Sequence, residues 1–183
     1  MRPTILLLPA LLLVLPAAAV AQSAPSADTV LIRSALSAAP ESVAEHATVA
    51  SFDGAVLREG SGDWVCLPDM PDVPNNAPMC LDANWREVID ALQNKREPQY
   101  SGVAVSYMLQ GDNPVSNTDP YATAPTAENQ WIQTGGPHIM IAVSDLTLLE
   151  GMSTDPENGG PWVMWAETPY AHIMVPTVPR PDR

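Results

Sequence analysis

Basic residues are scarce in this chain. Its 183 residues include 8 Lys and Arg against 21 Asp and Glu, and its formal net charge is −13 at pH 7. Binding to nucleic acid or to anionic lipid depends on Lys and Arg side chains that neutralise phosphate. The composition therefore predicts no nucleic-acid partner and favours a soluble, acidic protein.

Long apolar runs are also missing, except at the beginning of the chain. The run over residues 5–15 is shorter than the ~20 residues that span a membrane. Arg2 precedes it, and residues 19–21 form a small-x-small cleavage pattern, so residues 1–21 have the organisation of a secretory signal peptide cut before Gln22. We therefore expect a periplasmic or secreted monomer with no membrane span in the mature chain.

Cysteine is limited to Cys66 and Cys80, with thirteen residues between them. In an exported chain with two cysteines, a disulfide bond is the first expectation. Closing a loop of this length stabilises the fold by about 3 kcal/mol in the chain-entropy model. A redox pair or a pair of metal ligands is the alternative, but redox motifs have a two-residue gap and thiolate ligands usually come in fours.

Several sequence motifs of catalysis are absent. The chain contains no Gly-x-Ser-x-Gly elbow, no His-Glu-x-x-His zinc motif and no phosphate-binding glycine loop. The predicted disulfide leaves no thiol to act as a nucleophile. A hydrolase-type enzyme that uses His172 or His138 as a general base remains an alternative, and its test is the geometry around these side chains.

Proline is abundant, with 20 residues, and predicts long irregular connections around a modest core. We expect a single α+β domain with an antiparallel or mixed sheet and two or three helices. Residues 22–45 form an N-terminal segment with a short helix, residues 46–178 form the globular domain, and residues 179–183 form a flexible tail. The predicted elements are a helix over 29–38 capped by Asp28, a strand over 47–52, a hairpin of 55–59 and 63–67, a helix over 84–95 capped by Asn84, a strand over 100–110, and a short helix over 145–150 capped by Ser144.

Three apolar segments near the C-terminus predict the core of the sheet. Residues 135–141 are echoed 24 residues later by residues 159–165, and the pattern returns in part at 171–175. The link between the second and third segments has five residues, which favours an antiparallel hairpin. Its simple register sets Met164 opposite His172. The other face of these strands, which includes Trp165, is then expected to be ordinary core.

Strand alternation predicts a histidine- and methionine-rich face on these segments. It places His138 with Met140, and His172 with Met174. Imidazole suits copper and zinc, and thioethers select Cu(I), so these four residues are a candidate copper or zinc site. The alternative is packing, because Met fills gaps in cores and favours aromatic neighbours. The two histidines can share an ion if their strands are adjacent.

A long loop from Gly111 to Gln130 is the remaining candidate site, because loops of this length are often functional. Asp112, Asn117 and Asp119 supply the hard oxygen atoms that calcium prefers. Their spacing does not match the twelve-residue calcium loop, and Asx-Pro steps are also ordinary turn chemistry.

Four stretches resemble a family of uncharacterised exported bacterial proteins. They are residues 62–69 (GDWVCLPD), 78–82 (PMCLD), 107–111 (YMLQG) and 169–176 (PYAHIMVP). The resemblance covers roughly residues 46–176 and implies one exported domain with a paired cysteine, without implying an activity. Our leading expectation is a non-enzymatic binding or accessory domain for a small ligand or protein, followed by a metal-binding protein and then by an enzyme.

Overall fold

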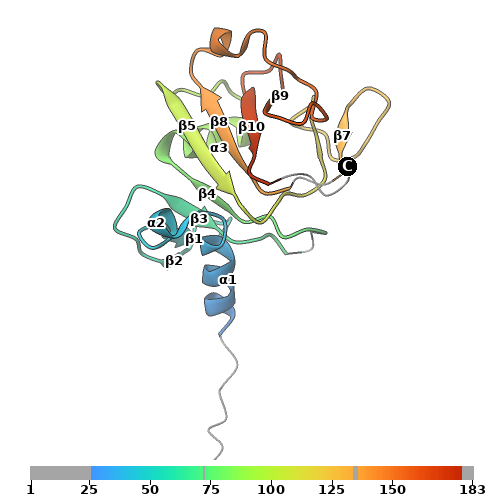
Figure 1. Ribbon diagram of the computed structural model, residues 1–183. Helices are drawn as coiled ribbons and strands as arrows, with labels where there is room; N and C mark the ends of the chain where they lie inside the picture. Colours follow the sequence, from blue (N-terminus) through green and yellow to red (C-terminus); the bar gives the residue numbers. More distant parts are fainter. Residues whose placement is uncertain (1–25, 72, 134–135, 179–183) are drawn as a thin grey trace, which may run out of the picture.

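The computed structural model describes residues 26–71, 73–133 and 136–178. The predicted signal peptide at 1–21 and the predicted tail at 179–183 lie outside these residues. The described residues form a single sheet-rich domain with three α-helices (Figure 1). The elements are α1 (Ala27–Leu36), α2 (Glu41–Ala44), β1 (Thr48–Ala50), β2 (Val56–Arg58), β3 (Val65–Leu67), β4 (Met79–Leu81), α3 (Ala83–Gln93), β5 (Val103–Met108), β6 (Val115–Ser116), β7 (Trp131–Ile132), β8 (His138–Val143), the 3₁₀ helix η1 (Leu146–Leu149), β9 (Trp162–Met164) and β10 (His172–Pro176).

The main sheet has eight strands in the order β2-β1-β3-β4-β5-β8-β10-β9. β1 and β3 run parallel, and the other neighbouring pairs are antiparallel. β6 lies within the predicted long loop and forms a separate two-stranded ladder with β7, which directly follows that loop. A mixed sheet with three helices in the described residues confirms this part of the predicted fold class.

Helix α3 is capped at its N-terminus by Asp82, and this residue also joins the helix to the sheet. One carboxylate oxygen of Asp82 accepts a hydrogen bond from the backbone N–H of Trp85 at 2.7 Å, and the other accepts one from the N–H of Val105 at 2.8 Å. The prediction that Asn84 caps this helix is wrong. Asn84 lies in the first turn, and its side-chain amide donates to the carbonyl of Val103. The carboxylate of Asp82 is better placed because it serves both the helix and β5.

Helix α1 also begins earlier than the sequence indicates. Its cap is Ser26, whose hydroxyl accepts from the N–H of Thr29, whereas the predicted cap Asp28 lies in the first turn. Ala35 and Ala38 are fully buried. They belong to the same core as β1 and β3, so from Ser26 onward this N-terminal segment is part of the folded unit.

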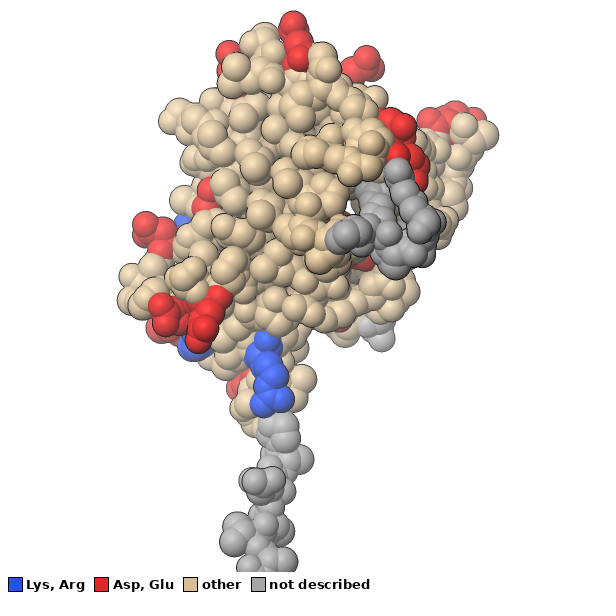
Figure 2. Space-filling model, viewed as in Figure 1, with Lys and Arg blue, Asp and Glu red and all other residues tan. Residues whose placement is uncertain are grey.

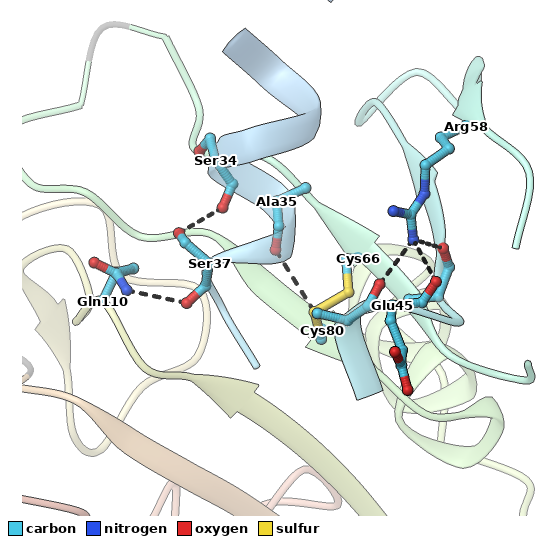
Figure 3. The surroundings of a disulfide bond; sticks show 10 residues. Ser34, Ala35, Ser37, Glu45, Arg58, Cys66, Cys80 and Gln110 are labelled. Atoms are coloured by element: carbon cyan, nitrogen blue, oxygen red, sulfur yellow. Dashed lines mark hydrogen bonds between the residues drawn. A yellow bond between two sulfur atoms is a disulfide. The ribbon is translucent and has the colours of Figure 1, made fainter. Parts of the chain in front are cut away.

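The disulfide bond between Cys66 and Cys80 is confirmed (Figure 3). The two residues are direct partners on β3 and β4, and both are fully buried. The Sγ atom of Cys80 lies 3.6 Å from the carbonyl oxygen of Ala35. The bridge therefore joins two neighbouring strands beneath α1, close to the beginning of α3.

The predicted hairpin of residues 55–59 and 63–67 is wrong, because β2 and β3 lie on either side of β1. The connecting loop crosses the backbone that leads into β1. A Cβ atom at Gly60 would lie 2.3 Å from backbone atoms of Ala47 and Thr48, and the N–H of Gly62 donates to the carbonyl of His46. This close approach requires glycine and keeps β2 and β3 apart.

The two faces of β5, β8 and β10 differ in composition. The inner face, which packs under α3, carries Ala104, Ser106, Met108, His138, Met140, Ala142, His172 and Met174, all of them buried. The outer face carries Val103, Val105, Ile139, Ile141, Val143, Ile173 and Val175, none of which is fully buried. Figure 2 shows this side of the molecule, with most of its Asp and Glu side chains toward the margin.

The prediction that the outer face is ordinary core is therefore wrong for some of the residues on that face. Ile173 and Val175 are only partly buried, although Val163 is 4% exposed. Trp165 lies beyond β9 and contacts the ring of His172 on the inner face. α1 covers the outer face over β1, β3 and β4, and η1 covers it near β9, which leaves the middle of the sheet partly open (Figure 1).

Candidate functional sites

The sequence His-Ile-Met occurs twice, in β8 and in β10, and the two copies lie side by side. The strands are antiparallel, and Met140 is the direct partner of Met174. His138 faces Pro176 and His172 faces Ala142, so the histidines occupy opposite ends of the pair. Four residues along a strand correspond to ~13 Å. The strands are adjacent, but their direction prevents the two histidines from sharing an ion.

Each histidine has a methionine as its direct partner on the strand at its other side. The register pairs His138 with Met108 on β5. It pairs His172 with Met164 on β9, as the predicted hairpin requires. All four residues are at most 3% exposed.

Both histidine rings are held by the same local hydrogen bond. Nδ1 of His138 lies 2.6 Å from the carbonyl oxygen of Gly136, and Nδ1 of His172 lies 2.9 Å from that of Tyr170. A carbonyl only accepts, so Nδ1 carries the proton and Nε2 presents its lone pair. In the described part of the chain, neither Nε2 atom has a hydrogen-bond partner, and both are inaccessible to solvent.

The surroundings of His172 are aromatic and dry. Its ring centroid lies 5.2 Å from that of Trp85 and 5.0 Å from that of Trp165, both in edge-to-face geometry. Burial, with a smaller contribution from the charge of His138, lowers the pKa of His172 from 6.5 to about 4. His172 is therefore a neutral imidazole at pH 7.

Asp112 lies near His138 on the inner side of the sheet. Burial raises the pKa of Asp112, and the nearby charge of His138 partly offsets this rise. Its Oδ1 atom accepts a hydrogen bond from the N–H of Asn113. This places the predicted calcium ligand Asp112 near a histidine.

The other predicted calcium ligands bind protein groups. The side chain of Asn117 is 2% exposed; its oxygen accepts from Nε1 of Trp162 and its amide donates to the carbonyl of Thr154. Asp119 accepts from the N–H of Tyr121 in a local turn. Among the described residues, no three His, Cys, Asp or Glu side chains are grouped so that they could hold a metal ion, and the calcium site stays a prediction.

A pocket of about 620 Å³ lies where η1, the end of β9 and the turn before β10 meet. Its floor is formed by Leu149, Val163 and Ala171, which are at most 8% exposed. Three glutamates, Glu97, Glu150 and Glu167, are among the lining residues, and all three are exposed. The remaining lining residues are Leu146, Gly151, Met152, Thr154, Ala166, Thr168 and Pro169.

The wall formed by η1 has a local explanation. Asp145 caps η1 by accepting from the N–H of Thr147. The prediction of Ser144 as the cap is wrong, because its hydroxyl accepts from the N–H of Gly102 and so ties this segment to β5. The φ angle of Gly151 is +79°, as expected for a glycine that ends a helix.

A strained turn before β10 also lines the pocket. Trp165 and Glu167 have φ angles of 53° and 66°, in the left-handed region that costs a non-glycine residue about 1–2 kcal/mol. The turn is closed by a hydrogen bond from the N–H of Thr168 to the carbonyl of Trp165. It holds Glu167 at the pocket and directs the ring of Trp165 toward His172.

A second, smaller pocket of about 210 Å³ continues from the first. The two share Glu97, Leu146 and Pro169, and the smaller one is completed by residues that include Tyr100 and Val143. Neither histidine of the inner face lines either of these two pockets.

Comparison with known proteins found no matching family model, no matching curated protein and no matching solved structure. The resemblance to an exported bacterial family is therefore still a prediction. No helix in residues 26–71, 73–133 or 136–178 is long and apolar enough to cross a membrane.

Proposed function

We propose that this chain is an exported, soluble, non-enzymatic binding domain whose ligand is an apolar molecule with a positive charge. The observation that carries the proposal is the pocket beside η1. It has a buried apolar floor and three exposed glutamates, and none of the described residues that line it is Lys, Arg or His.

The size and lining of the pocket suit a small molecule. Its volume of about 620 Å³ falls within the ~300–1,000 Å³ that is usual for ligand sites. Affinity would come from removing hydrocarbon from water, at about 25 cal/mol per Å² of apolar surface. Leu149 and Val163 provide the buried surface for this contact.

The carboxylates supply selectivity rather than most of the affinity. An exposed ion pair contributes roughly 0–1 kcal/mol, because solvent screens it. Three carboxylates without a compensating cation nevertheless favour an ammonium group and disfavour a carboxylate or phosphate of the same size. Glu150 follows η1 and Glu167 lies in the turn before β10, so the two lining glutamates come from separate segments, and both are exposed.

The ligand class is tested with two probes that differ in their head group, decylammonium and decanoate. Both are titrated into the oxidised protein, and the methyl resonances of Ala166 and Ala171 are followed by NMR. We expect decylammonium to bind at least ten times more tightly. Equal affinities, or tighter binding of decanoate, would contradict the proposed selectivity.

Variants locate the binding within the molecule. Ala166→Trp fills the pocket and should abolish binding of both probes. Glu150→Gln/Glu167→Gln should bring the affinity for decylammonium close to that for decanoate. Glu59→Gln/Glu128→Gln removes two exposed carboxylates that do not line the pocket and should change nothing. Binding that survives in Ala166→Trp would place it elsewhere.

Export is supported by the signal pattern at residues 1–21 and by the buried disulfide, since disulfides persist in oxidising compartments. Expression of the full chain in a bacterium, followed by cell fractionation and intact mass measurement, tests it. The proposal expects an extracytoplasmic protein that begins at Gln22. A cytosolic protein that retains residues 1–21 would refute export.

A further inference from the structure

The inner face of the sheet carries two sets of soft ligands with the same geometry. In each set a histidine begins a strand, a methionine lies two residues further along that strand, and a second methionine is the direct partner on the neighbouring strand. The His138 trio consists of Met108, His138 and Met140, and the His172 trio consists of Met164, His172 and Met174.

An approximate two-fold relation connects the trios. β8 and β10 are antiparallel, and their central contact is the pair Met140 and Met174. The outer methionines, Met108 and Met164, come from β5 and β9, which flank the pair. Direct partners on neighbouring strands have Cβ atoms ~4.5–5.5 Å apart, and residues two apart on one strand are separated by ~6.6 Å. Each histidine therefore has two methionines beside it on the same face of the sheet.

Both histidines have the tautomer and orientation that a metal ligand requires. In each, the Nδ1–H group donates to the carbonyl two residues earlier: His138 donates to Gly136 and His172 donates to Tyr170. Histidines that bind metals commonly make this contact, because it fixes the tautomer that leaves Nε2 as a donor atom. Both Nε2 atoms are buried and have no hydrogen-bond partner in the described residues.

Packing alone does not account for this arrangement. A buried polar atom without a partner costs about 1–3 kcal/mol. On the inner face this cost arises at both histidines, and Oγ of Ser106 is a third such atom among the described residues. Leucine would fill the same space without it.

We infer that each trio binds one Cu(I) ion through Nε2 of its histidine and the two methionine sulfurs. Thioether sulfur is a soft ligand that selects Cu(I), and imidazole suits copper as well. A donor set rich in thioethers suits Cu(I) better than Zn²⁺, which is bound by Cys, His and carboxylate groups, or Ca²⁺, which is bound by oxygen atoms. This site is on the face opposite the pocket beside η1 and does not depend on a ligand there.

The test is a titration of the oxidised full chain with Cu(I), supplied as its acetonitrile complex under argon. This form needs no reductant that could open the disulfide. Competition against a chromogenic Cu(I) chelator gives the stoichiometry, for which we expect two ions per chain. Quenching of tryptophan fluorescence reports on the His172 trio, because Trp85 and Trp165 contact its ring.

Methionine-to-leucine variants preserve side-chain volume and separate the trios. The variant M108L/M140L should retain one ion, and so should M164L/M174L. The variant M164L/M174L should also lose most of the fluorescence quenching. The variant with all four substitutions should bind no Cu(I) ion. The matched control M70L/M79L changes one exposed and one partly buried methionine outside the trios and should retain both ions.

A measurement on the unaltered chain covers the case in which a variant does not fold. In ¹⁵N NMR spectra of the histidine rings, Cu(I) should shift the Nε2 resonances of His138 and His172 while Nδ1 stays protonated. Fewer than two ions in the unaltered chain, retention of both ions by the fourfold variant, or unshifted Nε2 resonances would overturn the inference.

Discussion

The buried histidine His172 predicts that the metal-free protein loses stability in mild acid. Its pKa is 6.5 in an ordinary environment and about 4 in the fold, because burial disfavours the charged ring. Between these two values the unfolded chain binds a proton that the folded chain does not. Stability therefore rises with pH across this window and falls as the solution is acidified.

The size of the effect follows from the two pKa values. The full gap between 6.5 and about 4 corresponds to about 3 kcal/mol once the pH is below both values. Between pH 7 and pH 5 the loss is about 2 kcal/mol. For a domain of this length such a loss lowers Tm by roughly 4–8 °C.

Two carboxyl groups also change the stability of the fold at acidic pH, and their effects can be separated from that of His172. The pKa of Asp112 is raised in the fold, so its protonation on acidification stabilises the folded chain and opposes the effect of His172. The pKa of Glu87 is lowered to about 2, chiefly by its hydrogen bond from Arg96, and its contribution is lost only as the pH falls below 4.5. The window from pH 7 to 5 is therefore informative for His172.

The assay is urea unfolding at pH 7, 6 and 5, at constant ionic strength and with a chelator present. The unaltered chain is compared with His172→Gln, which removes the titrating ring. Their difference cancels the contribution of Asp112. The free energy of unfolding of the unaltered chain should fall by about 2 kcal/mol more than that of the variant. Parallel curves for the two chains would refute the assignment of the pH dependence to His172.

Three further predictions concern stability. Replacing Cys66 and Cys80 with Ala should lower the free energy of unfolding by about 3 kcal/mol, measured in urea, because the bridge closes a loop with a sequence separation of 14; a loss below 1 kcal/mol would contradict it. Asp82→Ala should cost about 2 kcal/mol in the same assay, whereas Asp28→Ala, which removes no cap, should cost little. Glu167→Gly should raise Tm by relieving about 1 kcal/mol of backbone strain while weakening decylammonium binding, and Glu167→Ala should weaken binding without the gain.

Local patterns in the sequence were sufficient to predict the structure where segments that are neighbours in the sequence pair with each other. The hairpin of β9 and β10 was predictable in register, because the link has five residues and the apolar residues alternate. The disulfide followed from the cysteine count. The burial of α3 followed from the spacing of Trp85 and Val88 along one helical face.

Non-local choices could not be read from the sequence in the same way. β1 pairs with both β2 and β3, which requires the loop at Gly60 to cross the backbone near Thr48. No local signal marks that crossing. The direction of β10 beside β8 is also a property of the complete sheet, and it decides that His138 and His172 lie apart.

The pocket was missed for the same reason. Glu97, Glu150 and Glu167 come from three separate segments, and each is an ordinary exposed carboxylate in isolation. The signals in the sequence were Gly151, which ends η1, and the short link before β10. Both predict turns, and neither shows that the turns meet around a cavity.

The strongest physical indication that the His138 and His172 trios have a role is which face of the sheet the fold buries. β5, β8 and β10 each carry aliphatic side chains on one face and Ala, Ser, His or Met on the other. Hydrophobicity favours burial of Val and Ile, at about 25 cal/mol per Å² of apolar surface. The fold instead buries the His and Met face under α3 and leaves Val103 51% exposed. Natural sequences depart from local consistency mainly at functional or strained sites. A face that gives up apolar burial and encloses two unpartnered imidazole nitrogens is expected where the side chains bind something, and soft ligands in this number favour a soft metal ion.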